Sequence, residues 1–223
     1  MKETALIVGA GSGLSASLAR LCASENMNVA LAARNIDKLD NLKNEINAHI
    51  FKCDSSNIQN VSSIFEQLDK TIGSPNLVIY NPSLRIRGNI QDLNPEATQE
   101  AINVTCFGGF LVAQQAAKRM IKNKKGSIFF TGASASKKGF AKSSVFAMGK
   151  FGLRGLAQSL ARELHPQNIH IGHFVIDGGI GKNSLEHKLI NPDSIAKTYI
   201  QFHKQDPSAW SWEVELRTNK EIF

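Results

Sequence analysis

Short apolar runs alternate along the chain with segments in which apolar residues recur at helical spacing. Ala5-Leu6-Ile7-Val8 is the first run, and Leu14, Leu18 and Leu21 follow it at the spacing of one helix face. Runs that are apolar throughout are typical of strands buried on both faces, and their alternation with helices is typical of a parallel sheet. Further strands are predicted at 29–32, 49–52, 77–80, 127–130, 169–176 and 214–216, and further helices at 36–47, 58–72, 95–123 and 143–165.

This rhythm predicts a doubly wound α/β fold, with a parallel sheet of about seven strands and helices on both faces. The sequence contains no internal repeat, low-complexity tract or long linker. We therefore expect residues 1–223 to form a single domain.

Composition excludes several classes of protein. Hydrophobic residues make up 42% of the chain and charged residues 20%, which is too apolar for a disordered protein. No apolar run approaches the roughly 18 residues of a membrane helix, and Met1–Thr4 leads directly into the first strand without room for a signal peptide. We expect a soluble, cytoplasmic protein that neither enters nor binds a membrane.

Cysteine and histidine spacing gives no sign of a metal centre. The three cysteines are far apart and form no Cys-x-x-Cys pair, which excludes a disulfide scaffold and the usual zinc motifs. His170 and His173 would lie on opposite faces of their strand. We expect no bound metal.

The positive charge has two interpretations. The formal net charge is +7, and basic runs lie at 118–125 and 137–142. Such runs occur on nucleic-acid-binding surfaces. The first run, however, lies where a predicted helix ends before Gly126, and cations there complement the helix dipole. We favour a solvated helix end and expect no nucleic-acid partner.

A glycine-rich turn follows the first strand and opens the first helix. Glycine allows a tight turn and lets a pyrophosphate approach the backbone, while the free amides and dipole of the helix N-terminus attract its charge. This placement, directly between the first strand and the first helix, is typical of a Rossmann-type dinucleotide site. The predicted cradle consists of Gly9, Gly11, Ser12, Gly13 and Leu14.

Arg34 follows the second strand, about 20 residues beyond the glycine turn. At this place an acidic residue would hold the ribose 2′-hydroxyl of NAD, whereas an arginine suits the 2′-phosphate of NADP. Ala33 precedes it, so no carboxylate stands at the strand end to repel that phosphate. We therefore expect NADP(H) to be favoured over NAD(H).

With these features the chain resembles the short-chain dehydrogenase/reductase family, nearly from end to end. The family's glycine pattern matches Gly9 and Gly13, but Ser15 stands at its third glycine. Tyr80-Asn81-Pro82-Ser83 occupies the place of its Asn-Asn-Ala-Gly motif and keeps only Asn81. The resemblance implies a cofactor site that adds Asp54, Ser55, Asn81, Lys150, Gly178 and Ile180 to the glycine turn and Arg34.

The family's catalytic tyrosine is missing. Its Tyr-x-x-x-Lys motif places the tyrosine four residues before Lys150, where this chain has Phe146, which has no proton to donate. The position of the family's catalytic serine holds Ala133, with Ser134 adjacent, and Asn103 matches its active-site asparagine. The stretches 130–136 and 208–217 resemble a bacterial subgroup that has Phe at the tyrosine position.

The resemblance implies an NADP(H)-dependent oxidoreductase that transfers hydride to or from a carbonyl or alcohol of a small molecule. Asn103, Ser134 and Lys150 would form its catalytic remnant, with Phe146 in the nicotinamide pocket. The alternative is a dinucleotide-binding protein without turnover, acting as a sensor or assembly partner. The family also implies a homodimer or homotetramer, and we expect the segment 179–192 to close over the substrate.

Overall fold

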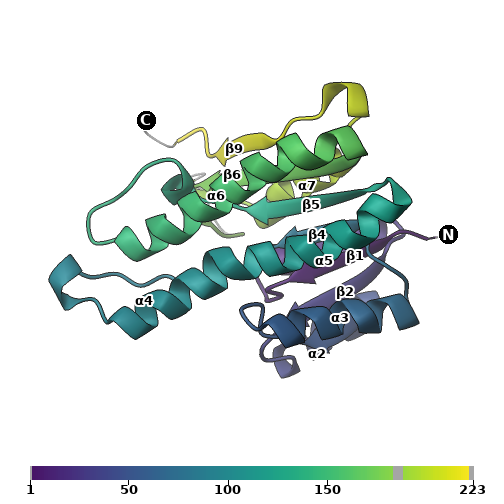
Figure 1. Ribbon diagram of the computed structural model, residues 1–223, viewed down its shortest axis with the longest axis horizontal. Coiled ribbons are helices and arrows are strands. Elements are labelled where there is room, and N and C mark those ends of the chain that lie inside the picture. Colours follow the sequence, from purple (N-terminus) through teal and green to yellow (C-terminus); the bar gives the residue numbers. More distant parts are fainter. Residues whose placement is uncertain (1, 183–187, 221–223) are drawn as a thin grey trace.

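Parallel pairing joins seven strands into one sheet in the order β3-β2-β1-β4-β5-β6-β9. The computed structural model, shown in Figure 1, describes residues 2–182 and 188–220. The doubly wound α/β fold predicted from the apolar rhythm is confirmed. The strands of this sheet are β1 (Thr4–Val8), β2 (Asn28–Ala33), β3 (His49–Lys52), β4 (Leu77–Tyr80), β5 (Gly126–Thr131), β6 (Ile169–Asp177) and β9 (Glu213–Arg217).

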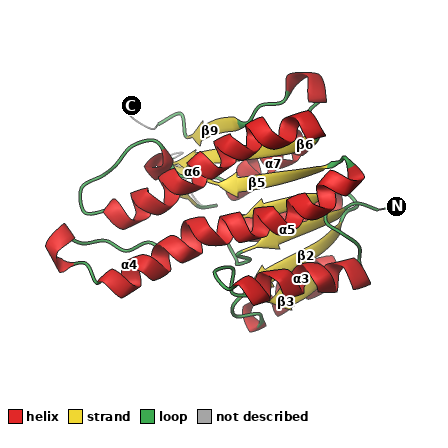
Figure 2. Cartoon of the chain, viewed as in Figure 1, coloured by secondary structure: helices red, strands yellow, loops and turns green. Residues whose placement is uncertain are grey.

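Helices cover both faces of the sheet, as Figures 1 and 2 show. One face carries α1 (Leu14–Ser24), α2 (Asp40–Ile46) and α7 (Pro192–His203). The opposite face carries α3 (Ile58–Thr71), α5 (Gly108–Asn123) and α6 (Ser144–Leu164). Successive strand residues point to opposite faces, so each strand contributes to both cores.

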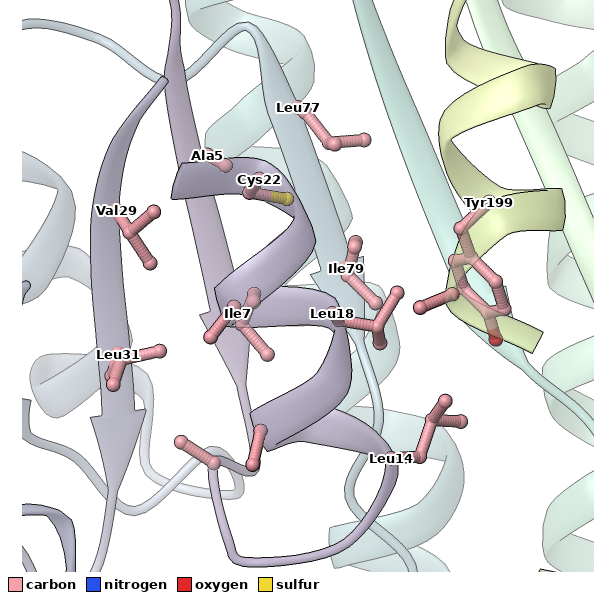
Figure 3. Close-up of a cluster of buried hydrophobic side chains, with 14 of the residues drawn as sticks. Ala5, Ile7, Leu14, Leu18, Cys22, Val29, Leu31, Leu77, Ile79 and Tyr199 are labelled. Atoms are coloured by element: carbon pink, nitrogen blue, oxygen red, sulfur yellow. The ribbon is translucent and has the colours of Figure 1, made fainter. Parts of the chain in front are cut away.

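The core beneath α1 illustrates this alternation. Ile7 and Leu31 face α1, where they meet Leu18 and Cys22, and Tyr199 approaches from α7 (Figure 3). The intervening residue Leu6 belongs to the core on the other face. The continuous apolar runs of the sequence thus reflect strands that are buried on both sides.

The long helix predicted over 95–123 is not one continuous helix. It begins as α4 (Pro95–Ile102), passes through a π-helical turn at Asn103–Phe107, and continues as α5. The buried Tyr80 hydroxyl donates to the carbonyl of Val104 inside this turn and lies 3.3 Å from the Ser55 hydroxyl. Helical periodicity cannot reveal such an inserted residue, because the apolar pattern resumes beyond it.

Several elements had no counterpart in the sequence prediction. Helix α7 was not predicted, nor was the small sheet of β7 (Gly179–Ile180) and β8 (Leu189–Ile190). The helix predicted at 36–47 starts as a 3-10 turn at Asp37–Leu39 before α2 begins. Two-residue strands have no periodicity to detect, which explains why β7 and β8 were missed.

Two helical glycines provide a test of the packing at the π turn. A Cβ on Gly108 would lie 2.3 Å from the Tyr80 hydroxyl and 2.6 Å from the Ser55 carbonyl, whereas a Cβ on Gly155 in α6 would meet no atom within 4 Å. Gly108→Ala should lower the free energy of unfolding by at least about 2 kcal/mol. Gly155→Ala should raise it by about 0.5–1 kcal/mol, because alanine favours the helix. Urea unfolding measures the free energy of unfolding of both variants. The same change in the two variants would contradict the close packing around Gly108.

Candidate functional site

Two neighbouring cavities lie at the carboxyl ends of the parallel strands. The large cavity has a volume of about 1010 Å³ and extends from the first turn of α1 to Phe146 and Lys150 on α6. The small cavity has a volume of about 280 Å³ and lies beyond the ends of β2 and β3. Asn81 and Ser83 line both cavities, so the two adjoin at the loop that follows β4.

The first turn of α1 presents its amides without a side-chain cap. Gly13 precedes the helix and makes no side-chain cap hydrogen bond, whereas Asn57, Asn94 and Asn191 cap α3, α4 and α7. The first amides of a helix need partners and carry the positive end of its dipole. This turn therefore fits an anionic group such as a diphosphate.

The glycines of the turn serve two different purposes. Gly9 has φ +81°, and a Cβ there would lie 2.7 Å from the backbone nitrogen of Pro82, so only glycine fits. A Cβ on Gly11 or Gly13 would meet no protein atom within 4 Å, so these residues leave the backbone open to a ligand. The cradle that the sequence predicted is thus accessible from the side on which a dinucleotide would lie.

Ser15 takes the place of the family's third glycine without disturbing the turn. Its buried hydroxyl donates to the Gly9 carbonyl at 3.0 Å and accepts from the Asn81 side-chain amide at 2.7 Å. These bonds tie the start of α1 to the glycine turn and to the end of β4. The departure from the glycine pattern is therefore compensated by hydrogen bonding.

Arg34 and Lys38 supply positive charge to the small cavity. The Arg34 side chain is 61% exposed and lies 3.8 Å from Glu100, a separation at which an exposed ion pair holds it only weakly. Asp54 and Ser55 line the same cavity. Burial alone would raise the pKa of Asp54, but hydrogen bonds from Ser56 and the charge of Arg34 lower it. This arrangement leaves the Arg34 guanidinium available to a phosphate.

Lys150 is buried at the other end of the large cavity. Only 2% of its surface is exposed, and its ammonium donates to the Thr131 carbonyl at 2.6 Å. Burial, and secondly the charge of Arg85, lower the pKa of Lys150 to about 7. This group therefore exchanges its proton near neutral pH, which suits it to proton transfer.

Phe146 lies one helical turn before Lys150 and lines the same cavity. The Lys150 nitrogen lies 5.7 Å from the centre of its ring, and the Arg85 guanidinium lies 4.3 Å from that centre. Sequence reasoning missed Arg85, because it lies in the loop after β4, where no motif marks it. The place of a tyrosine hydroxyl is thus taken by an apolar ring with two cations beside it.

The loop after β5 brings Ala133 and Ser134 to the large cavity. Ser134 begins a short 3-10 turn at Ser134–Ser136, and both Ala133 and Ser134 line the cavity. The hydroxyl of Ser136 instead accepts from the Ala133 amide at 3.1 Å, which stabilises the loop. Ser134 therefore remains the candidate hydroxyl on this side of the site.

Asn103 lies apart from Lys150. It lines a separate cavity of about 490 Å³ with residues such as Ser144 and Met148, and does not line the large cavity. Thr105, two residues further along the π turn, is buried; its hydroxyl accepts from the Leu84 amide at 3.1 Å, and its side chain lies against Gly149. Neither residue lines the large cavity, but Thr105 supports its wall through the Leu84 amide and Gly149, and the role expected for Asn103 stays a prediction.

The strand end after β6 completes the large cavity. Gly178 and Ile180 both line it, and Gly178 has φ +151°; their contact with a cofactor stays a prediction. Gly11 and Ser12, in the glycine turn, line neither cavity. Part of the segment expected to close over the substrate, residues 183–187, lies outside the described residues.

Other features of the chain bear on its partners. Within residues 2–182 and 188–220, no group of three or more His, Cys, Asp or Glu side chains could hold a metal ion. A search of the same residues found no helix long and apolar enough to cross a bilayer. In the basic run at 118–125, Arg119 and Lys125 form ion pairs with Asp69 and Glu3, each at 2.7 Å. These pairs favour a structural interpretation of the run.

Comparison with known proteins decides the family. The model of the short chain dehydrogenase family matches residues 3–184, most of the chain. This chain belongs to the short-chain dehydrogenase family. A solved short-chain dehydrogenase from Rhodopseudomonas palustris has the same fold, with a TM-score of 0.87 and 32% identity over 96% of this chain and 98% of that one.

Two further relatives have more specific names. A metagenomic short-chain oxidoreductase solved in complex with NADP is 25% identical, with a TM-score of 0.86, and the match covers 96% of each chain. Sorbitol-6-phosphate 2-dehydrogenase of Escherichia coli is 28% identical over 217 residues, 90% of this chain and 83% of that protein. The relatives of this short-chain dehydrogenase are thus oxidoreductases, and its fold is one that binds nicotinamide dinucleotides.

The buried Lys150 predicts a pH-dependent difference in stability. Its pKa is about 7 in the fold and near 10.5 in the unfolded chain, so between these values the unfolded state holds a proton that the native state has released. The contribution of Lys150 to stability therefore rises as pH increases from about 7 to about 10.5. Lys150→Met should therefore raise the free energy of unfolding of the cofactor-free protein. The increase should be largest near pH 6 and progressively smaller towards pH 10. Urea unfolding at several pH values measures this difference in free energy between the variant and the natural protein. A difference that does not change with pH would contradict the lowered pKa of Lys150.

Proposed function

We propose that this short-chain dehydrogenase is an NADP(H)-dependent oxidoreductase that interconverts a carbonyl and an alcohol on a small molecule. One observation carries the proposal: a single cavity connects the uncapped first turn of α1 to the buried ammonium of Lys150. The α1 turn fits the diphosphate of a dinucleotide. The Lys150 ammonium supplies a titratable proton where the nicotinamide of that dinucleotide would lie. The chain would act as one dinucleotide-binding unit.

The described residues fit such a cofactor along the whole edge of the sheet. The α1 turn would hold the diphosphate, Asp54 and Ser55 would lie beside the adenine, and Lys150 would contact the nicotinamide ribose. Gly178 and Ile180 would lie beside the carboxamide. When bound, the cofactor supplies or accepts hydride at its nicotinamide ring.

The small cavity favours the phosphorylated form of the cofactor. Arg34 and Lys38 line it together, and the nearest carboxylate to Arg34, Glu100, is 3.8 Å away and half-exposed. Such cations bind a 2′-phosphate through charge-assisted hydrogen bonds, which are stronger than bonds between neutral groups. The preference for NADP(H) over NAD(H) rests on these two side chains.

Proton transfer would proceed without a tyrosine. Phe146 offers no acid, so the Lys150 ammonium, with a pKa of about 7, would deliver the proton to the carbonyl oxygen during reduction and take it back during oxidation. The Thr131 carbonyl holds this nitrogen at the cavity wall. Ser134 would position the carbonyl oxygen by donating its hydroxyl hydrogen.

A second candidate function is dinucleotide binding without turnover. The observation in its favour is that the positions of the tyrosine and the serine hold Phe146 and Ala133, while Gly9, Gly13 and Arg34 of the proposed cofactor site are kept. Loss of a general acid typically slows a reaction by about 10²–10⁴-fold rather than stopping it. We therefore place turnover first and the sensor second.

Exchange of Arg34 tests the cofactor assignment. Arg34→Asp removes the phosphate partner and introduces an acceptor for a ribose hydroxyl, so NADPH affinity should fall about tenfold or more while NADH affinity rises. Fluorescence titration of both cofactors measures the change. Arg162→Asp, the same charge change far along α6, is the control and should alter neither affinity. If Arg34→Asp kept the same preference for NADPH over NADH, Arg34 would not be a ligand of the 2′-phosphate.

Restoring the phenol tests whether the rest of the site is competent. Phe146→Tyr places a hydroxyl beside Lys150, whose positive charge lowers a phenol pKa, so carbonyl reduction should accelerate at least about tenfold. Phe151→Tyr, on an exposed part of the same helix, is the matched control. Consumption of NADPH with a panel of aldehydes and ketones gives the rate. Bound cofactor with no gain in rate would favour the sensor.

An exposed apolar surface on α5 and α6 supports the expected oligomer. Phe107 and Phe110 stack at 6.0 Å near the start of α5, and Met148 and Phe151 are exposed on α6. Neighbouring exposed apolar side chains are typical of protein interfaces. We propose a homodimer or homotetramer through these helices.

Light scattering measures the assembly directly. The natural protein should give particles of two or four chains at micromolar concentration, and Phe110→Glu combined with Phe151→Glu should shift them towards 24.4 kDa. Single-chain particles of the natural protein at that concentration would contradict the proposal.

A further inference from the structure

The large cavity is lined by cations and, among the described residues, by no carboxylate. Arg85, Arg87, Lys142 and Lys150 all line it, and none of the Asp and Glu residues in 2–182 and 188–220 does. Like charges gathered on one wall repel one another, and the charge of Arg85 adds to the larger effect of burial in lowering the pKa of Lys150. A fold maintains such a cluster at a cost in stability, and a bound anion would relieve it.

Arg85 and Arg87 are exposed residues on the wall of the cavity. Ser83, Arg85 and Arg87 line the cavity, while the intervening Leu84 and Ile86 do not. This alternation is that of an extended segment, in which every second side chain points the same way. The large-cavity loop, residues 82–89, therefore presents one charged face to the cavity.

Two hydrogen bonds fix this loop in place. The Leu84 amide donates to the Thr105 hydroxyl at 3.1 Å, which anchors the loop to the π turn, and the Gly88 amide donates to the Lys142 carbonyl at 3.1 Å. The Arg85 guanidinium then lies 4.3 Å from the centre of the Phe146 ring. The arginine is held by a cation–π contact rather than by an acid, so its hydrogen-bond donors remain available.

The pairing of other arginines makes this availability informative. Arg119 pairs with Asp69 and Arg154 with Glu213, each through short contacts. Among the described residues, neither Arg85 nor Arg87 has a carboxylate within ion-pair distance, and the same holds for Lys142. Within the described residues Arg162 also has no ion pair, but it stands alone on the surface, whereas Arg85, Arg87 and Lys142 gather at the cavity that contains Lys150.

We propose that the substrate is an anionic carbonyl compound, whose carboxylate or phosphate is bound by Arg85 and Arg87 beside the reacting carbon. The inference rests on the proposed function of this same cavity. A guanidinium donates two parallel hydrogen bonds to either anion, so both chemistries fit the arginines. Lys142 adds a third positive charge at the cavity wall.

The arginines serve the substrate rather than the cofactor because of where they lie. The diphosphate fits the first turn of α1, and the 2′-phosphate fits Arg34 in the small cavity. Arg85 instead lies against Phe146, beside the ammonium that transfers the proton. An anion bound there is within a few bonds of the carbonyl that Lys150 would protonate.

Matched pairs of carbonyl compounds test the proposal through turnover. Acetoacetate is compared with its methyl ester, and dihydroxyacetone phosphate with dihydroxyacetone. The charged member of at least one pair should have a kcat/KM about tenfold higher, chiefly through KM. Which pair shows the preference identifies the carboxylate or the phosphate.

Variants connect that preference to the loop. Arg85→Gln and Arg87→Gln should each lower the ratio of charged to neutral kcat/KM about tenfold, and Arg85→Lys should retain part of it. Arg162→Gln, an equal loss of charge outside the cavity, should leave the ratio unchanged. An equal fall in kcat/KM for the charged and the neutral compound of a pair would overturn the proposal, because Arg85 would then act on the carbonyl itself.

Calorimetry gives a readout that needs no turnover. Malonate and phenyl phosphate are titrated into the protein loaded with NADPH, and at least one should bind more tightly than in Arg85→Gln by about tenfold. NADPH affinity is measured in the same variant and should not change. Failure to bind NADPH would defeat the proposed function, whereas bound NADPH with no anion binding, or with weakened NADPH binding in Arg85→Gln, would defeat this inference alone.

Discussion

Parallel pairing of the seven strands determines where the candidate site of this molecule lies. Because the strands run in one direction, their carboxyl ends meet at one edge of the sheet, and the loops after β1, β2, β4, β5 and β6 converge there. The dipole of α1 begins at this edge, and Lys150 reaches it from α6. A ligand that spans the edge therefore meets an anion-binding turn at one place and a buried ammonium at another.

A chain of buried contacts connects the core to the charged wall of the cavity. The hydroxyl of Tyr80, at the end of β4, donates a hydrogen bond to the Val104 carbonyl in the π turn. The same turn holds Thr105, whose hydroxyl accepts a hydrogen bond from the Leu84 amide. That bond positions the neighbouring Arg85 over Phe146. The side chain that replaces the first asparagine of the family motif, Tyr80, thus helps to set the geometry of a site that it does not line.

Local patterns predicted the fold, whereas the roles assigned to the cofactor and catalytic residues stay predictions. Strand and helix positions depend on periodicity, and the glycine turn depends on neighbours in sequence, so both could be predicted from the chain alone. The supporting contact of Thr105 was not predicted, because α-helical spacing does not give the directions of side chains inside a π turn. Arg85 was missed because its role arises from packing against Phe146, a residue distant in sequence.

The candidate site combines an uncapped helix start with a buried lysine beside Phe146, where the family has a tyrosine. Its central claim is that a phosphorylated nicotinamide dinucleotide lies along the carboxyl edge, with its diphosphate on the amides that open α1. The most direct measurement is a titration of NADPH into isotopically labelled protein, followed by amide resonances. The account predicts saturable shifts at Gly13, Leu14 and Ser15 together with Arg34. Absence of any shift, or shifts confined to residues away from this edge, would contradict it.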